Sequence, residues 1–152
     1  NKTFINNWEY YPMTDGEIQF LLDNLLSVVD PRLIKIITYE DNVVGFLLAF
    51  PDISAALQRQ KGRITPWGVV DMILEMKRTK WVSLNGAGVL PEYHGRGGNA
   101  LLYDEMQETI QSFHFEHAEL TQVAETAVQM RKDLISLGGV PYKNHRVYRR
   151  SI

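Results

Sequence analysis

Hydrophobic residues first recur at helical spacing near the N-terminus of the chain. The apolar positions are Ile18, Leu22, Leu25 and Val29. Just before them, Thr14 and Glu17 have the spacing of a capping box, in which each side chain satisfies a free backbone donor. This pattern predicts a helix that begins after Thr14 and ends at Pro31.

Two apolar, β-rich runs follow, at residues 33–39 and 42–50. Only Glu40 and Asp41 separate them, so we expect a hairpin of buried strands. Residues 51–61 have the pattern of a short helix, and the run GRITPWG at 62–68 is a turn-rich break. Residues 69–78 then have a broad apolar face at helical spacing, which predicts a second helix.

The second half of the chain contains a strand pattern interrupted by glycine. The run at 81–90 contains Gly86 and Gly88, and two glycines in one strand indicate a bulge or a close backbone approach. After Pro91 and a glycine-rich turn we expect a long amphipathic helix. A strand at 118–124, a helix at 127–137 closed by Gly138 and Gly139, and a final strand, Tyr142–Arg149, complete the pattern. This alternation predicts a single α/β or α+β domain over residues 1–152.

The composition of the chain argues against several classes of function. The 152 residues are 45% hydrophobic and 22% charged, which is typical of a globular domain. A net charge of −2 argues against a general nucleic-acid binder. The chain has no cysteine, which excludes a disulfide framework and a cysteine nucleophile. No apolar run approaches the roughly 18 residues of a membrane span, so we expect no membrane partner.

The glycine-rich turn carries the most specific chemistry. A helix N-terminus has free N–H groups and a partial positive charge, and glycines let a bulky anion approach them. Six consecutive residues form this candidate phosphate site: Gly95, Arg96, Gly97, Gly98, Asn99 and Ala100. The P-loop pattern is absent, and a dinucleotide fingerprint is met only nominally, as G-x-G-x-x-A. The glycines alone leave a nucleotide cofactor and coenzyme A as alternatives.

The segment from Val89 to Leu102, VLPEYHGRGGNALL, resembles the signature V-x-P-x-Y-x-G-x-G-x-G/A of the GNAT N-acetyltransferase superfamily. His94 stands where Gln or Arg is usual, and Asn99 where Gly or Ala is usual. Shorter motifs elsewhere are similar to a bacterial subgroup of that superfamily: NWEYYPMTDGE at 7–17, VGF at 44–46, PD at 51–52 and RVY at 146–148.

This resemblance implies a mixed, mostly antiparallel sheet flanked by helices, in which the family's fourth and fifth strands splay apart. It implies acetyl-CoA as the cofactor, with Val89 and Leu90 beside the pantetheine and residues 95–100 around the pyrophosphate. It implies direct transfer of the acetyl group to the amine of a small molecule or peptide. The family's first strand would lie upstream of Asn1, so we expect additional N-terminal sequence in the parent protein.

Catalytic groups are harder to assign than the cofactor site. Ser83 and Asn85 are expected on the same strand face as Val89, and Glu125 is expected at the end of the next strand, so Asn85 and Glu125 are the candidates. The family's protonating tyrosine and a nearby asparagine are replaced by Leu134 and Ala127. The four histidines do not have metal-ligand spacing, and we expect no metal.

Two alternative functions follow from these features. The missing tyrosine favours an acyl-CoA-binding domain without catalysis, and the helical segment at 51–78 favours a non-enzymatic interaction domain. We expect a cytoplasmic protein, and a homodimer is one of the states that the sequence allows.

Overall fold

The computed structural model describes residues 11–25, 29–63, 65–121, 123–146, 148 and 150. The chain divides into two compact units, Asn1–Thr121 and Gln122–Ile152, and each is described by itself. Residues 7–10 of the motif predicted at 7–17 lie outside the described residues, and 11–17 lie within them.

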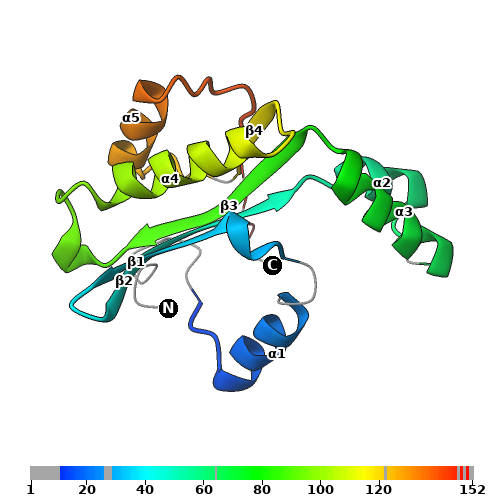
Figure 1. Ribbon diagram of the computed structural model, residues 1–152, viewed down its shortest axis with the longest axis horizontal. Coiled ribbons are helices and arrows are strands. Elements are labelled where there is room, and N and C mark those ends of the chain that lie inside the picture. Colours follow the sequence, from blue (N-terminus) through cyan, green and yellow to red (C-terminus); the bar gives the residue numbers. More distant parts are fainter. Residues whose placement is uncertain are drawn as a thin grey trace. The chain divides into compact units, whose positions relative to one another are not determined.

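A four-stranded sheet forms the centre of the first unit (Figure 1). Its strands, in spatial order, are β1 (Ile34–Tyr39), β2 (Asn42–Pro51), β3 (Trp81–Val89) and β4 (His117–Leu120). The first three pair antiparallel and β4 runs parallel to β3. The predicted mixed, mostly antiparallel sheet is therefore confirmed.

The predicted hairpin is formed by β1 and β2. Its two-residue turn is Glu40 and Asp41, whose φ angles are 46° and 64°. Two consecutive positive φ angles give a turn whose twist matches that of the flanking strands, so a two-residue connection is sufficient.

Helix α1 (Asp15–Leu25) begins at the predicted capping box. The Thr14 N–H donates to Glu17 Oε2 at 2.8 Å, and the Glu17 N–H donates to Thr14 Oγ1 at 3.4 Å. The prediction that the helix continues to Val29 is wrong, because Val29 is not helical; residues 26–28 lie outside the described part of the chain.

Helices α2 (Ser54–Gln60) and α3 (Pro66–Arg78) form a helical hairpin between β2 and β3. The predicted break at 62–68 is too long, since α3 already begins at Pro66. The Thr65 hydroxyl caps the helix by accepting a hydrogen bond from the Gly68 N–H at 3.1 Å. Proline at the first helical position removes a donor that would have no partner there.

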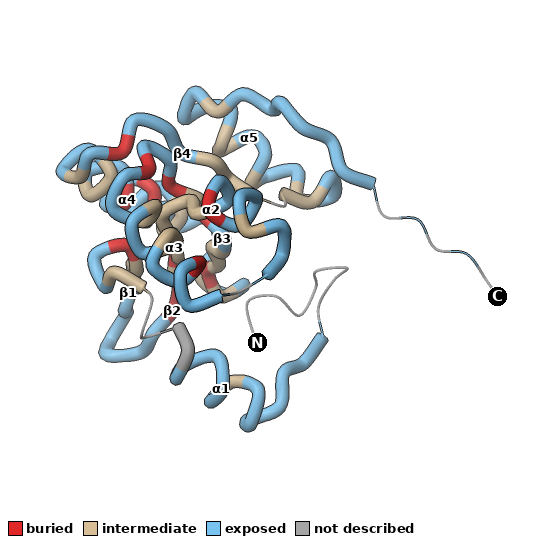
Figure 2. The backbone as a smooth tube through the Cα atoms, turned by 90° about the vertical axis from the view of Figure 1, so that its right-hand side faces the viewer, coloured by how far each residue is buried: buried red, intermediate tan, exposed pale blue. Residues whose placement is uncertain are grey.

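Helix α4 (Gly98–Ser112) packs against one face of the sheet and closes the core. Its inward side chains, Leu102 and Met106, are buried with Leu47 of β2 and Val82 of β3. Figure 2 shows that most of the buried residues of this unit lie on the strands and on α4, while α1 is mostly exposed. The predicted amphipathic helix after the glycines is confirmed.

We expect Met106→Ala to lower the free energy of unfolding by about 2–5 kcal/mol, because Met106 is 1% exposed and its loss leaves a cavity. Leu101→Ala is the matched control on the same helix, since Leu101 is 53% exposed. Urea unfolding measures both. Equal destabilisation by the two substitutions would contradict this assignment of the core.

The second unit contains helix α5 (Val128–Ser136), which is followed, as predicted, by the closing glycines Gly138 and Gly139. Gly138 has a φ of 86°, and the Gly139 N–H donates to the Leu134 carbonyl at 2.9 Å. The predicted final strand, Tyr142–Arg149, is wrong for the residues described, because 142–146 and 148 are not in a strand. Tyr142 and Tyr148 are mostly exposed, and a strand needs a hydrogen-bonded neighbour to form.

Candidate functional site

Strand β3 contains a β-bulge at Asn85. Gly86 pairs with Leu48 and Leu84 with Ala49, so Asn85 has no partner on β2. The glycines of this strand indicated such an irregularity, but its effect on the side chains was not predicted. The expectation that Ser83 and Asn85 share a face with Val89 is wrong, because the extra residue reverses the alternation of side chains along the strand.

The bulge coincides with the point where β4 leaves β3. Pairing between these strands ends at Leu84 and Leu120, and the Thr121 N–H donates to the Leu84 carbonyl at 3.2 Å. The predicted strand at 118–124 therefore ends at Leu120. Asn85 Oδ1 accepts hydrogen bonds from the Thr121 hydroxyl at 2.5 Å and from the Ser83 hydroxyl at 3.1 Å. Asn85 thus connects the two strands where they separate.

Beyond the bulge, one edge of β3 carries unpaired backbone groups. The Leu90 N–H donates to the Val44 carbonyl of β2 at 2.8 Å. Along an antiparallel strand, every second residue directs its backbone N–H and C=O groups toward the same neighbouring strand. Gly86 and Gly88, like Leu90, therefore direct these groups toward β2, whereas Ala87 and Val89 direct theirs toward the opposite edge. No strand in the described part of the chain pairs with that edge after Leu84. The N–H groups of Ala87 and Val89 are therefore available to a ligand.

The glycine-rich turn follows directly and leads into α4. Gly95 and Gly97 have φ angles of 75° and 83°, and Gly97 is the N-terminal cap of the helix. A Cβ atom at either position would meet no heavy atom within 4 Å, so the space over the turn is open. The first backbone bond of the helix is from Leu101 N–H to Gly97 O, at 3.0 Å. The preceding three N–H groups, at 98–100, have no acceptor among the described residues.

Two side chains connect this turn to the sheet. His94 Nε2 lies 2.8 Å from the Val89 carbonyl oxygen, so the ring joins the turn to the end of β3. The Arg96 guanidinium lies over the Tyr93 ring, 5.3 Å from its centroid, and Tyr93 in turn contacts Tyr39 of the hairpin. Arg96 is exposed and belongs to the open turn, so its guanidinium can contact a charged group of a ligand bound there.

A groove of about 520 Å³ lies where β2 and β3 meet the helices α1, α2 and α3. Its lining is mostly apolar: Leu21, Val29, Phe50, Pro51, Ile53 and Met76. The polar lining residues are Asp52, Ser54, Ser83 and Asn85. Of the two β3 residues among them, Ser83 precedes the bulge and Asn85 is its extra residue, so the groove lies beside the bulge.

The structure brings some of the predicted site residues together and separates others. Val89 and the residues at 95–100 are brought together by β3, the turn and the start of α4. Asn85 lies at the groove, while Leu90 uses both backbone groups within the protein: its N–H binds Val44 and its carbonyl accepts from Tyr93. Glu125 is an exposed turn residue of the second unit and not the end of a strand.

Asp52 is a groove residue to which the sequence assigned no role. It is the one carboxylate among the described residues that line the groove. Its N–H donates to the Trp81 carbonyl at 2.9 Å, and its Oδ1 accepts from the Ser54 N–H at 2.8 Å. The PD motif at 51–52 indicated this position, but the groove is formed by five elements that are spread along the sequence.

Comparison with solved structures identifies the fold as that of the GNAT acetyltransferases. The aminoglycoside N-acetyltransferase AAC(6')-Iy, solved in complex with a bisubstrate analogue of coenzyme A, superposes with a TM-score of 0.58 and 17% identity, over 95% of this chain and 84% of that one. The enzyme AAC(6')-IG from Acinetobacter haemolyticus gives a TM-score of 0.58 and 14% identity, over 93% and 85%. A comparison with models of known protein families gave no match.

Two curated proteins are similar in sequence. The bacterial ceramide synthase of Caulobacter vibrioides is 25% identical over 158 residues, covering 100% of this chain and 41% of that protein. Protein YghO of Escherichia coli K12 is 27% identical over 160 residues, covering 100% and 40%. The chain thus spans about two fifths of the length of these curated relatives.

Proposed function

We propose that this chain binds an acyl-coenzyme A and transfers its acyl group to an amine. The observation that carries the proposal is the juxtaposition of two unsatisfied sets of backbone donors. One set lies on the open edge of β3, at Ala87 and Val89, and the other lies at the glycine-rich start of α4. The fold of the GNAT acetyltransferases, and the complexes of AAC(6')-Iy with coenzyme A, support the same assignment.

The residues present fit the pyrophosphate of coenzyme A. The N–H groups at 98–100 point out of the first turn of α4, where the helix dipole favours negative charge. The open space over Gly95 and Gly97 admits a bulky anion close to these donors. Arg96 supplies a positive charge beside the turn, for a charge-assisted contact with a phosphate oxygen.

The unpaired edge of β3 fits the rest of the molecule. The N–H groups of Ala87 and Val89 form a short ladder that can pair with the amide groups of pantetheine, as a further strand would. Coenzyme A supplies the acyl group as a thioester, which an amine can attack with loss of the thiol. A backbone donor at this edge can stabilise the negative charge that develops on the thioester oxygen.

The groove beside the bulge is our proposed acceptor site. Its apolar walls suit an acceptor or acyl group with a hydrocarbon portion, and its polar end suits an amine. The name of one relative, bacterial ceramide synthase, supports this choice, since a ceramide is the amide of a long-chain amine. An aminoglycoside, the acceptor class named for the solved neighbours, would meet few polar partners along these walls.

Asp52 is the proposed base. An ammonium must lose a proton before it can attack, and Asp52 is the carboxylate that lines the groove. Asn85 Oδ1 is used by two hydroxyl groups, so its amide NH₂ is the part of Asn85 that can orient the acceptor. A catalytic role for Glu125 stays a prediction. With leucine at 134, we propose that the departing thiolate takes its proton from water.

Two measurements on the full chain test the proposal. Isothermal titration with acetyl-CoA and with a long-chain acyl-CoA is expected to show one binding site, and the release of free thiol is expected only when an amine is added. Long-chain amines are expected to be better acceptors than aminoglycosides. Binding without turnover of any amine would favour an acyl-CoA-binding domain without catalysis. A lack of binding would reject both.

A further inference from the structure

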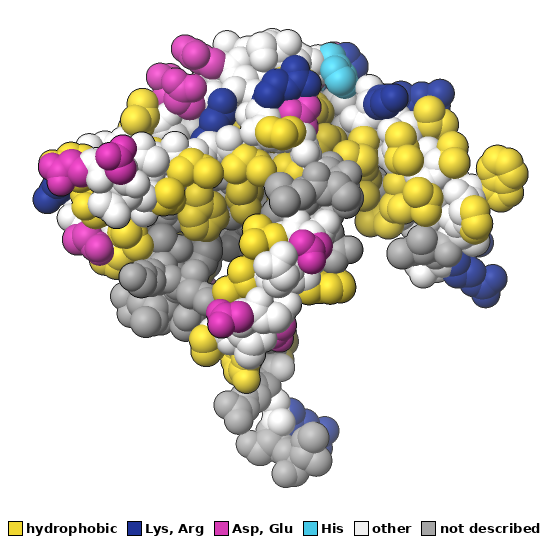
Figure 3. Space-filling view, turned by 60° about the horizontal axis from the view of Figure 1, so that its bottom comes forward, with side chains coloured by type: hydrophobic (Ala, Val, Ile, Leu, Met, Phe, Trp, Pro, Cys, Tyr) yellow, Lys and Arg dark blue, Asp and Glu magenta, His cyan; other side chains and the backbone are white. Residues whose placement is uncertain are grey.

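The α2–α3 hairpin, Ser54–Arg78, exposes an apolar face that the proposed reaction does not use. Trp67 at the start of α3 is 83% exposed, and five further residues of the hairpin are 40–49% exposed: Leu57, Val69, Val70, Ile73 and Leu74. Trp67, Val70 and Leu74 recur at helical spacing, so they form one stripe along α3. Figure 3 shows hydrophobic side chains gathered over this hairpin.

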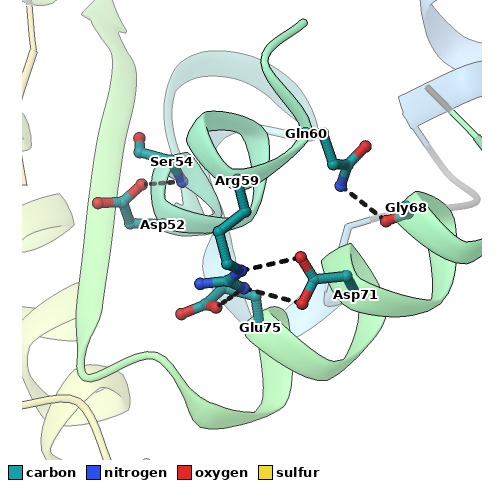
Figure 4. A network of polar contacts seen from close by, with 7 residues as sticks. All are labelled: Asp52, Ser54, Arg59, Gln60, Gly68, Asp71 and Glu75. Atoms are coloured by element: carbon teal, nitrogen blue, oxygen red, sulfur yellow. Dashed lines mark hydrogen bonds and ion pairs between the residues drawn. The ribbon is translucent and has the colours of Figure 1, made fainter. Parts of the chain in front are cut away.

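The charges of the hairpin are strongly biased. It carries five basic residues against two acidic ones, in a chain whose net charge is −2. Both acidic side chains are used internally: Arg59 of α2 binds Asp71 through two hydrogen bonds of 3.0 and 2.9 Å and also binds Glu75 (Figure 4). The hydrogen-bonded Arg59 guanidinium lowers the pKa of Asp71 below its usual value.

Because both acidic side chains of the hairpin pair with Arg59, the side chains that carry the remaining charges are basic. Lys61, Arg63 and Lys77 have no ion pair among the described residues. Lys61 and Arg63 lie in the connection between α2 and α3, close in sequence to Trp67, and Lys77 lies in the last turn of α3. Arg78, next to Lys77, contributes to the lowered pKa of Asp71.

We propose that the α2–α3 hairpin binds the surface of an anionic lipid membrane. An apolar stripe containing tryptophan, flanked by lysine and arginine, is the pattern of a helix that lies in the membrane interface. None of the described helices has the length and apolar character needed to cross a membrane, and the expectation of no membrane partner rested on that argument. Binding at the surface needs no spanning segment.

Unpaired cations favour a lipid surface over a protein partner here. Each lysine or arginine at an anionic surface strengthens binding, and this contribution weakens with salt. Met76 of α3 and Ile53, just before α2, line the groove, so the hairpin that would attach to the membrane also forms part of the groove wall. The inference does not depend on acyl transfer, since it rests only on the hairpin.

The test is sedimentation of the full chain with vesicles of phosphatidylcholine alone and with vesicles containing a third phosphatidylglycerol. We expect binding to the anionic vesicles, weakened by salt, and a blue shift of tryptophan fluorescence that Trp67→Tyr diminishes. Lys61→Gln with Arg63→Gln should weaken binding about fivefold for each charge removed. Trp67→Ser with Val70→Ser should weaken it at least roughly tenfold.

Matched controls come from α5. Val128→Ser with Ile135→Ser removes apolar side chains that are each 57% exposed, and Arg131→Gln with Lys132→Gln removes two charges. These variants are expected to bind vesicles like the wild type. Failure to bind anionic vesicles, or binding that the hairpin variants leave unchanged, would overturn the proposal. A dimer in solution that Trp67→Ser dissociates, without vesicle binding, would assign the face to a second copy of the chain.

Discussion

Gly97→Val is expected to weaken coenzyme A binding by roughly 10- to 150-fold for each hydrogen bond to the charged phosphate that is lost. Gly97 caps α4 with a φ of 83°, a conformation that a β-branched residue adopts only under strain. Its new side chain would also enter the open space over the donors at 98–100. Isothermal titration with coenzyme A measures the loss.

Gly138→Val is the matched control for this substitution. Gly138 has a φ of 86°, and a Cβ atom there would likewise meet no heavy atom within 4 Å. Both variants are expected to lose about 1–2 kcal/mol of unfolding free energy, because each forces a left-handed conformation on valine. Only Gly97→Val should lose coenzyme A. An equal loss of binding in both would show that the glycine-rich turn is not the site.

Asp52→Asn is expected to lower kcat by about 10²- to 10⁴-fold, the contribution of a positioned base. The KM for the amine should change little, since asparagine keeps the size of the side chain. Asparagine also keeps the oxygen that accepts the Ser54 N–H, so the turn before α2 is preserved (Figure 4). Initial rates of thiol release across a range of pH, with the best amine of the panel, measure both constants.

The control for the lost charge is Asp41→Asn, at the tip of the β1–β2 hairpin. Asp41 has a φ of 64°, which asparagine tolerates well, so the turn should remain intact. This variant is expected to keep the wild-type rate. Should Asp52→Asn also keep that rate and its pH dependence, the proton must leave by another route, and the assignment of Asp52 would be wrong.

Local signals in the sequence predicted the local features of the fold. The capping box at Thr14 and Glu17 and the two-residue turn at Glu40 and Asp41 are each specified by residues within a few positions of one another. The same is true of the glycine-rich turn, where the spacing of proline, glycines and helix is contained in one segment. For such features the interacting groups are neighbours in the chain, so the pattern contains most of the information.

Features that depend on a distant partner were predicted poorly. Gly86 and Gly88 indicated a bulge, but only the register against β2 shows that Asn85 is the extra residue. That register moved Ser83 to the face opposite Val89. The role proposed for Asp52 depends on a groove assembled from several elements, and the predicted strand at 142–149 had no neighbour to define it.

Without a bound ligand, the edge of β3 beyond Leu84 has no strand partner in the described part of the chain. The N–H groups that we propose to pair with pantetheine can pair equally with an extended segment of another molecule, which is the general hazard of exposed sheet edges. Pairing with β4 limits the length of the exposed edge, since β4 covers β3 up to Leu84. Coenzyme A in this position would also act as a cap on the sheet, so ligand binding and resistance to aggregation would depend on the same few peptide groups.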